Sequence, residues 1–259
     1  YHYFVMEYVE GKTLGDDLAA GKVFSEAEAL EIIIQVAKAL AHAHANSLIH
    51  RDVKPKNIMI SNNGSVKLAD MGLARATTDI EAAQSEAGKA YGTPYYIAPE
   101  QIRGKIDIDG RADIYGLGAT LYHMLTGRVP FMAEDSADVM RKHLREKLVP
   151  PDHINTSLSA GVSEVVEIMM AKRKEDRYHT VEELLEDLEA LQDGRLPVQA
   201  HKRFDVSMLE QLEEGDAVEV KEKAYEEETI ANYRMAVLIL STVAAVFLLV
   251  IVLLLLLKR

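Results

Sequence analysis

The sequence contains no cysteine. This absence excludes a disulfide framework and a thiolate metal site, and it is typical of a domain that faces the cytosol. Basic side chains are in the minority, because 29 Lys and Arg stand against 41 Asp and Glu and give a formal net charge of −12. Binding along a nucleic acid requires a basic patch, so we expect no nucleic-acid partner. The length of 259 residues allows one large domain or two small ones.

The most informative stretch is Ile49–Ile60, IHRDVKPKNIMI, in which two short apolar runs flank a polar core. The core supplies a carboxylate at Asp52, a cation at Lys54 and an amide oxygen at Asn57. Phosphoryl transfer needs these groups, because a carboxylate must reach the acceptor hydroxyl, a cation must lie near the phosphate and an oxygen must bind a metal ion. The alternative is a polar surface loop between two strands, which would not explain the whole eight-residue pattern.

The pattern H-R-D-x-K-P-x-N resembles the catalytic loop of eukaryotic-like (Hanks-type) Ser/Thr protein kinases. The resemblance implies an α+β, protein-kinase-like fold, ATP as phosphate donor, Mg²⁺ or Mn²⁺ as cofactor and protein Ser/Thr hydroxyls as acceptors. It makes Asp52 the catalytic base with Lys54 beside it, and Asn57 a metal ligand. Arg51 precedes the base, so its guanidinium would receive a phosphate on the activation loop.

The first residues, Tyr3–Tyr8, are apolar and aromatic, which predicts a buried strand that runs into a turn. Beside the catalytic loop, this stretch resembles the last strand of a kinase N-terminal lobe and the hinge. The resemblance makes Met6 the gatekeeper, assigns adenine binding to the backbone from Glu7 to Val9, and places Met59 on the floor of the adenine pocket. A simple edge strand is the alternative.

A hairpin signal at Ser61–Ser65 precedes a short predicted strand at Val66–Ala69. The strand leads to the position of the kinase D-F-G motif, where Asp70 would hold Mg²⁺ against the β- and γ-phosphates. Met71 stands where the family usually has Phe, and its unbranched apolar side chain can fill the same slot under His50.

The polar segment Arg75–Tyr91 resembles an activation loop. Within it, Thr77 and Thr78 are either phosphorylation sites or plain solvated residues. Thr93 belongs to a G-T-P tripeptide that resembles the substrate-binding end of the loop, and Glu100 closes an A-P-E anchor.

Three helices are predicted from caps and apolar periodicity. The first spans Ser25–Asn46 and begins with a capping box of Ser25 and Glu28. His42 and His44 on this helix are not a metal pair, because positions two apart do not share a helix face.

The second helix opens at Asp113 and ends at Gly127, and it resembles the buried central helix of the kinase C-terminal lobe. In that likeness Asp113 holds the backbone of the catalytic loop, and Arg177 pairs with Glu100. The third helix is predicted from a capping box of Thr180 and Glu183 and from the apolar positions that follow it.

The 259 residues include no Gly-rich phosphate loop, no phosphate-binding lysine ahead of the hinge and no helix glutamate to pair with it. We therefore interpret the sequence as an N-terminally truncated fragment, with the hinge and the mainly helical C-terminal lobe at residues 1–193. A pseudokinase scaffold that binds partners through this lobe is the alternative, disfavoured by the retained Asp52 and Asp70. A small-molecule phosphotransferase is disfavoured by the G-T-P and A-P-E motifs.

Residues 194–233 are expected to form an acidic juxtamembrane linker, as a helical stalk or a solvated spacer. Residues 234–257 are expected to form a single transmembrane helix, because Met235–Leu257 carries no charge and would be about 34 Å long as a helix. This organisation resembles receptor-type bacterial kinases. It implies a single-pass protein of the cell membrane with a cytoplasmic kinase domain, the lipid bilayer as a partner, and a homodimer that phosphorylates itself in trans.

Overall fold

The computed structural model describes residues 5, 7–70, 75–76 and 94–200. They all belong to one compact unit, Tyr1–Phe204, and the second unit, Asp205–Arg259, lies outside the described residues. The predictions for Met6, Met71, Thr77, Thr78 and Thr93 also lie outside them. No helix in the described ranges is both long enough and apolar enough to span a membrane, and these ranges do not include residues 234–257.

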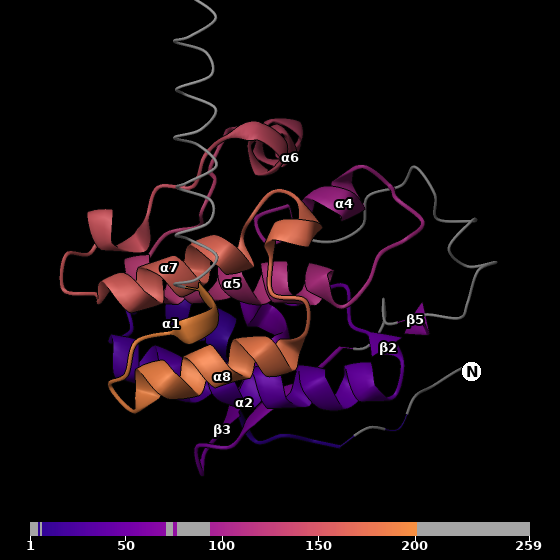
Figure 1. Ribbon diagram of the computed structural model, residues 1–259. Helices are drawn as coiled ribbons and strands as arrows, with labels where there is room; N and C mark the ends of the chain where they lie inside the picture. The colour runs from indigo at the N-terminus through magenta and orange to yellow at the C-terminus, as the bar shows by residue number, and fades with distance from the viewer. Residues whose placement is uncertain (1–4, 6, 71–74, 77–93, 201–259) are drawn as a thin grey trace, which may run out of the picture. The chain divides into compact units, whose positions relative to one another are not determined.

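The described residues combine many helices with short strands, which confirms the expected α+β class with mainly helical content (Figure 1). The helices are α1 (Leu14–Ala19), α2 (Glu26–Ala45), α4 (Pro99–Ile102), α5 (Arg111–Thr126), α6 (Ser136–Arg145), α7 (Ala160–Met169) and α8 (Val181–Gln192). The 3₁₀ turns are η1 (Pro55–Asn57), η3 (Pro151–His153) and η4 (Lys174–Asp176). The strands are β1 (Gly11–Thr13), β2 (Leu48–Ile49), β3 (Ile58–Ser61), β4 (Val66–Leu68) and β5 (Arg75–Ala76).

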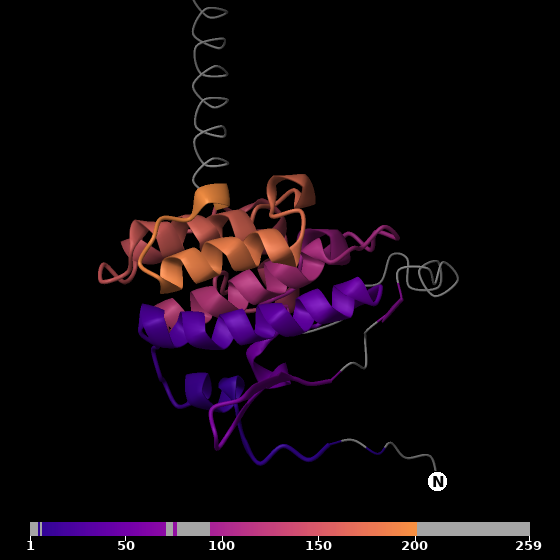
Figure 2. The ribbon, with the colours of Figure 1, turned by 60° about the horizontal axis from the view of Figure 1, so that its bottom comes forward.

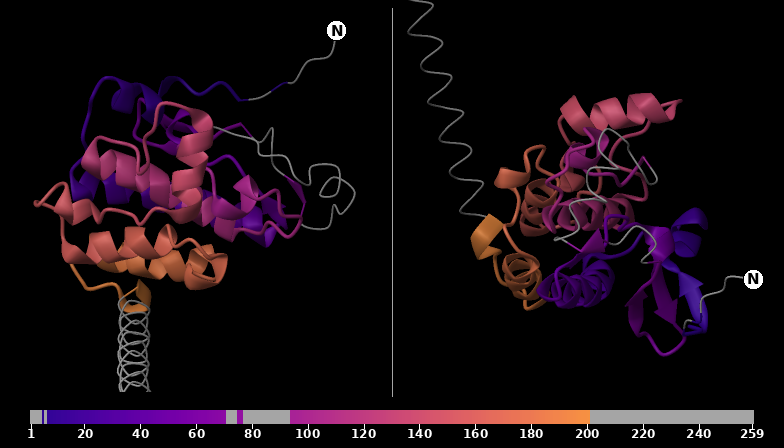
Figure 3. Two further views of the ribbon diagram at one scale, coloured as in Figure 1. Left: turned by 90° about the horizontal axis from the view of Figure 1, so that it is seen from above. Right: turned by 90° about the vertical axis from the view of Figure 1, so that its right-hand side faces the viewer.

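The long helices stack in layers around α5 (Figure 2). Helix α2 packs against α5 and α8, and α7 packs on α5 from the other side. The antiparallel sheet β1-β3-β4 lies beside α2 as a small separate layer, with α1 against it (Figure 3, right). Strands β2 and β5 form a second, two-stranded sheet.

Helix α2 forms where its cap and its apolar stripe predict it. The Ser25 hydroxyl accepts a hydrogen bond from the N–H of Glu28, and the Glu28 carboxylate accepts one from the N–H of Ser25, so the capping box is confirmed. Fully burying a Leu or Ile side chain contributes about 1.5–3 kcal/mol, and the buried side of α2 supplies several such residues. The buried members are Ala29, Leu30, Ile33, Ile34, Val36, Ala37 and Leu40.

Helix α5 is the core of the described body. It begins at Arg111, two residues before the predicted start, and it ends as predicted at Gly127, whose φ of 71° is left-handed. Almost all of its side chains from Ala112 onward are buried. A Cβ at Gly116 would lie 2.8 Å from the carbonyl oxygen of Val53, so the glycine lets the catalytic loop rest directly on the helix.

The hairpin predicted at Ser61–Ser65 joins β3 to β4, with Gly64 at a φ of 82°. Strand β4 is one residue shorter than predicted. The last helix, α8, is capped by the side chain of Thr180, which accepts from the N–H of Glu183. The Glu183 carboxylate accepts from the N–H of His179 at 2.9 Å and not from the N–H of Thr180. The capping box predicted at this helix is therefore only half formed.

The prediction of a buried strand at Tyr3–Tyr8 is wrong for its described residues. Val5, Glu7 and Tyr8 belong to no strand, and the side chains of Val5 and Tyr8 are 89% and 87% exposed. A strand needs a neighbour for its backbone hydrogen bonds, and no described segment pairs with this stretch. The first described strand is β1, at the position where a turn was expected.

Packing continues beyond the end of α8. Ala200 is buried, and its N–H donates to Asp187 Oδ2 at 2.7 Å. Tyr178 also donates to Asp187 Oδ2, at 2.8 Å. The buried carboxylate of Asp187 thus fastens the residues after the helix to the core.

Candidate active site

The loop that carries the H-R-D pattern runs from β2 through η1 into β3, and a buried carboxylate on α5 holds its start. Asp113, 1% exposed, accepts hydrogen bonds from the backbone N–H of His50 at 2.9 Å and of Arg51 at 2.7 Å. Arg51 has a φ of 67°, which costs roughly 1–3 kcal/mol outside glycine. The two hydrogen bonds to Asp113 hold the loop in this conformation and so fix the position of the next residue, Asp52.

Two further residues support the loop, and sequence reasoning missed both. His44 Nε2 lies 2.8 Å from Asp113 Oδ2, and Gln101 Nε2 donates to the carbonyl oxygen of Arg51 at 2.8 Å. The signal for His44 was present, because it follows Leu40 by four residues and therefore continues the buried stripe of α2. No local pattern marked Gln101.

The three chemical groups predicted for phosphoryl transfer lie together. Lys54 Nζ is 2.6 Å from Asp52 Oδ2, and Asn57 Nδ2 donates to Asp52 Oδ2 at 3.2 Å and to its backbone oxygen at 2.8 Å. The side chains of Asp52 and Lys54 are only 12% and 16% exposed, so their attraction is weakly screened. Among the described residues none donates a hydrogen bond to Asp52 Oδ1, which leaves that oxygen to accept a proton.

Asn57 and Asp70 are brought close by the backbone. The N–H of Ala69 donates to the carbonyl oxygen of Asn57 at 2.7 Å, and Asp70 is the next residue in the chain, with a φ of 63°. The amide nitrogen of Asn57 donates to Asp52, so the amide oxygen is the atom of this side chain that could bind a cation. Carboxylate and amide oxygens fit a hard divalent cation such as Mg²⁺. No group of three or more His, Asp or Glu that could hold a metal occurs in the described ranges.

His50 links the two halves of this site. Its Nε2 lies 3.1 Å from the carbonyl oxygen of Ala69, and its Nδ1 lies 3.3 Å from the N–H of Asp52. The ring therefore bridges the segment before Asp70 and the segment that carries Asp52. Met71, predicted to pack under this ring, lies outside the described residues.

The residues predicted to contact adenine lie along the small sheet. Met59 on β3 stands opposite Lys67 on β4, and the Lys67 ammonium binds the Glu7 carboxylate at 2.7 Å and 2.8 Å. Both charged side chains are largely exposed, so this ion pair contributes little stability. The ion pair still places the segment that contains Glu7 and the half-buried Val9 beside strand β4, the neighbour of the strand that carries Met59.

The A-P-E motif is fastened by a buried ion pair. Arg177 donates to both carboxylate oxygens of Glu100, at 2.7 Å and 2.8 Å, and the guanidinium and carboxylate side chains are 0% and 4% exposed. Arg177 also donates to the carbonyl oxygens of Ala171 and Arg111, at 2.8 Å and 2.9 Å. Such satisfied donors are what makes a buried charge tolerable. The pair ties α4 to the loop ahead of α8.

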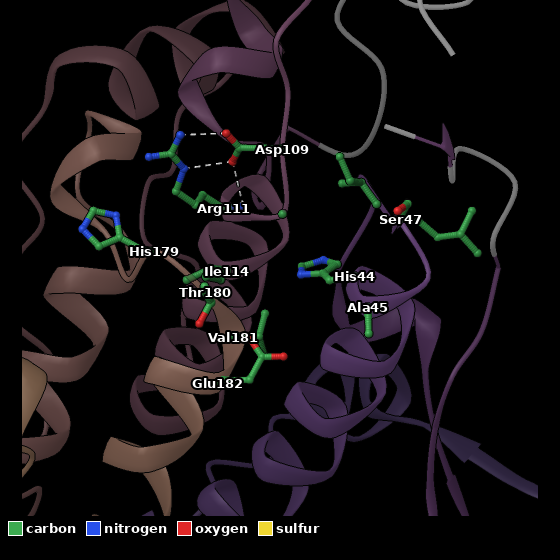
Figure 4. Close-up of a pocket in the computed structure, with 13 residues that line it drawn as sticks. His44, Ala45, Ser47, Asp109, Arg111, Ile114, His179, Thr180, Val181 and Glu182 are labelled. Carbon is green, nitrogen blue, oxygen red and sulfur yellow. Dashed lines mark hydrogen bonds and ion pairs between the residues drawn. The ribbon is translucent and has the colours of Figure 1, made fainter. Parts of the chain in front are cut away.

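A separate pocket of about 520 Å³ lies between the end of α2 and the starts of α5 and α8 (Figure 4). Arg111 and Asp109 line it and bind each other at 2.9 Å and 2.7 Å. Burial raises the pKa of Asp109, but hydrogen bonds from Arg111 and Lys174 outweigh it and bring the pKa to about 2. His44 lines the same pocket and contacts Asp113, so one side chain separates the pocket from the carboxylate that holds the catalytic loop.

The chain is similar in sequence to known proteins. Residues 1–188 match the family described as protein kinase domain. The chain is 41% identical over 195 residues to the serine/threonine-protein kinase PknB of Mycobacterium tuberculosis, which covers 75% of this chain and 31% of the relative. It is 42% identical over 193 residues to the probable serine/threonine-protein kinase CE0033 of Corynebacterium efficiens, with 73% and 29% covered. The chain thus spans about a third of the length of these curated relatives.

Proposed function

The chain belongs to the protein kinase family, and we propose that it transfers the γ-phosphate of ATP to serine and threonine hydroxyls of proteins. One observation carries the proposal: Asp52 is fixed by Lys54 and Asn57 through one carboxylate oxygen, while no described residue donates to the other. A general base must present such an oxygen to the hydroxyl that it activates. The serine/threonine kinases named among its relatives support the same acceptor class.

The roles of the residues follow from their positions. Asp52 Oδ1 accepts the proton of the acceptor hydroxyl, and Lys54 places its ammonium where negative charge builds up on the transferring phosphate. Asn57 and Asp70 would hold the divalent cation, which neutralises phosphate charge when bound. His50 and Asp113 keep the loop in the geometry that these contacts require. A scaffold without catalysis is not favoured, because Asp52 and Asp70 are retained and only the chemistry requires them.

Phosphoamino-acid analysis tests the acceptor class. Residues 1–259 include no Gly-rich phosphate loop, so the assay uses a completed chain in which a kinase N-terminal lobe precedes Tyr1. After incubation with ATP and Mg²⁺, the completed chain should carry phosphothreonine or phosphoserine, because Lys54 and Thr93 match the Ser/Thr class. A product dominated by phosphotyrosine would contradict the proposal. Mapping the modified residues also tests Thr77 and Thr78 as phosphorylation sites.

We further propose that residues 234–257 anchor the domain in a cell membrane, after the acidic linker at 194–233, with the kinase residues on the cytoplasmic side. The uncharged run is long enough to span the hydrocarbon core, and ATP is cytosolic. Protease added to right-side-out vesicles should spare residues 1–193, and digestion of these residues in sealed vesicles would refute this topology. Membrane anchoring would also concentrate the kinase for a homodimer that phosphorylates itself in trans. Mixing equal amounts of active and Asp52→Asn chains tests this, because the Asp52→Asn chains can be phosphorylated only by an active copy.

A further inference from the structure

The pocket of about 520 Å³ between the end of α2 and the starts of α5 and α8 contains none of the groups assigned to phosphate transfer. His44 and Ala45 line one side of it, and Ile114 and Glu182 line the other (Figure 4). This volume lies within the range of ligand sites, so the pocket can receive a side chain together with part of the chain that carries it.

The floor of the pocket is apolar. Ile49, Ile114 and Val181 line it and are buried, and the half-buried Leu48 lies beside them in the lining. An aliphatic stem that packs on this floor would lose its contact with water, which favours binding.

Most of the charge at the pocket is already compensated. Asp109 binds Arg111 and, at 3.1 Å, Lys174, while Lys174 also binds Asp107 at 2.9 Å. Arg111 donates in addition to the carbonyl oxygen of Lys174 at 3.3 Å. The two acids and two bases of this network cancel, so it leaves no net charge for a ligand.

The carboxylate of Glu182 is the other acidic group in the lining. It belongs to the first turn of α8 and is exposed, and no described residue pairs with it. The pocket therefore presents one uncompensated negative charge above an apolar floor. A positive group on an apolar stem complements this arrangement, and arginine and lysine side chains have that form.

Two hydroxyl groups in the lining can bind the backbone of an incoming chain. Ser47 and Thr180 are both exposed lining residues. The Thr180 oxygen accepts from the N–H of Glu183 at 3.2 Å, which leaves the hydroxyl proton to donate to a carbonyl oxygen. These hydroxyls favour a polypeptide over a free amine as the occupant.

We propose that this pocket is a docking site for an arginine or lysine side chain of a partner protein, with the stem on the apolar floor and the cation at Glu182. The occupant would also cover His44, whose side chain is 17% exposed, and exclude water from its contact with Asp113. Such a contact strengthens when water is excluded. Docking would therefore hold the catalytic loop more firmly, and it does not depend on phosphate transfer.

A pair of peptides tests the charge requirement. Residues 1–259 are titrated with fluorescein-labelled Gly-Leu-Arg-Leu-Gly and with the same peptide carrying citrulline, which keeps the shape of arginine and lacks its charge. Fluorescence anisotropy should show about tenfold tighter binding of the arginine peptide, as expected for a charge-assisted hydrogen bond. Equal affinities would overturn the proposal.

Two variants locate the binding. Glu182→Gln should reduce the ratio of the two affinities to about twofold or less, and Glu186→Gln, an exposed acid of α8 outside the pocket, should keep it. Ala45→Phe should weaken both peptides by filling the pocket, and Ala20→Phe is its matched control outside the lining. A ratio that survives in Glu182→Gln, or unchanged binding to Ala45→Phe, would refute docking at this site.

Two further ligands test the class of occupant. Agmatine carries the same guanidinium without a polypeptide and should bind at least about tenfold more weakly than the arginine peptide. Equal affinity would assign the site to free amines and overturn the choice of a protein partner. Tighter binding of a peptide with glutamate in place of arginine would show that Arg111 and not Glu182 determines the charge preference, which also contradicts the proposal.

Hydrogen exchange tests the effect on the catalytic loop. The amide of Arg51 donates to Asp113, and its exchange should slow at least about twofold when the parent chain is saturated with the arginine peptide. Unchanged exchange would overturn the link to the loop. No ATP is present in these measurements, so their failure leaves the proposed kinase function intact, and an inactive completed chain would leave the docking site intact.

Discussion

The carboxylate of Asp113 and the backbone N–H of Arg51 lie 2.7 Å apart, although 62 residues separate them in the chain. The same carboxylate receives the N–H of His50 and faces His44 Nε2 at 2.8 Å. Three contacts to one buried group explain how a loop with a left-handed residue keeps a single shape. The central helix α5 thereby sets the position of Asp52, although Asp113 bonds the two residues before Asp52 and not Asp52 itself.

Removing this carboxylate should destabilise the fold. Asp113→Ala would leave two backbone N–H groups without their acceptor in a buried site, and each such loss costs about 1–3 kcal/mol. We expect the free energy of unfolding of residues 1–259, measured by denaturant titration, to fall by about 2–5 kcal/mol. Asp107→Ala, which removes an exposed partner of Lys174, should cost at most about 1 kcal/mol. Equal effects of the two substitutions would show that Asp113 does not hold the loop.

The sequence predicted those features that are local. The cap of Ser25 and Glu28 and the end of α5 at Gly127 follow from residues a few positions apart, and both are confirmed. The stretch Tyr3–Tyr8 failed because an apolar run specifies burial only if a neighbouring strand exists to receive it, and none pairs with it in the described part of the chain. The family, and with it the α+β class, could be recognised because eight residues of the catalytic loop are contiguous.

Partnerships between distant segments were harder to predict. His44 contacts Asp113, and Gln101 contacts the backbone of Arg51, each from a different helix, and no spacing rule predicts either contact. Two contacts were expected only through the resemblance to kinases. They are the contact of Asp113 with the catalytic loop and the pairing of Arg177 with Glu100. The pocket between α2, α5 and α8 had no sequence signal, because its walls come from segments that are brought together only by folding.

The pair of Glu100 and Arg177 should show strong coupling. Glu100→Ala or Arg177→Ala would leave the other charge buried without its partner, at a cost of about 3–5 kcal/mol in the free energy of unfolding. The double variant should cost less than the sum of the two single variants. Arg195→Ala, which breaks an exposed pair with Asp193, should change stability by less than about 1 kcal/mol. Additive single effects would contradict a direct buried pair.

Glu167 should make stability depend on pH. Burial, together with the charges of Asp152 and Glu164, raises the pKa of Glu167 from 4.5 to about 7. The folded state therefore binds more protons than the unfolded state between about pH 4.5 and 7, and the free energy of unfolding should fall as the pH rises through this window. Above about pH 7 the full cost of the buried charge applies.

Glu167→Gln tests this contribution, because the amide resembles the protonated carboxyl group. The variant should exceed the parent in stability by roughly 1 kcal/mol at pH 8, a value reduced for the partial exposure of the side chain, and the difference should vanish near pH 4. Glu182→Gln on the exposed side of α8 is the control and should show no such pH-dependent gain. A gain for Glu167→Gln that is the same at pH 4 and pH 8 would rule out titration of this group.

The metal ligands can be tested by Mg²⁺ titration of activity in the completed chain. Asp70→Ala and Asn57→Ala should each raise the Mg²⁺ concentration needed for half-maximal rate and slow turnover, Asp70→Ala more severely, because alanine supplies no oxygen ligand. Asn63→Ala, in the exposed hairpin between β3 and β4, is the control and should leave the Mg²⁺ dependence unchanged. Normal Mg²⁺ dependence of Asp70→Ala would refute its assignment as a ligand.

The central claim is that Asp52 is the base of a protein kinase, and the rate of phosphate transfer by the Asp52→Asn variant of the completed chain tests it most directly. The amide keeps the size of the side chain but accepts a proton poorly, so transfer to a protein substrate should fall by at least about 10²–10⁴-fold while nucleotide binding remains nearly intact. The account predicts this separation of binding from chemistry. A transfer rate close to that of the parent chain would contradict it.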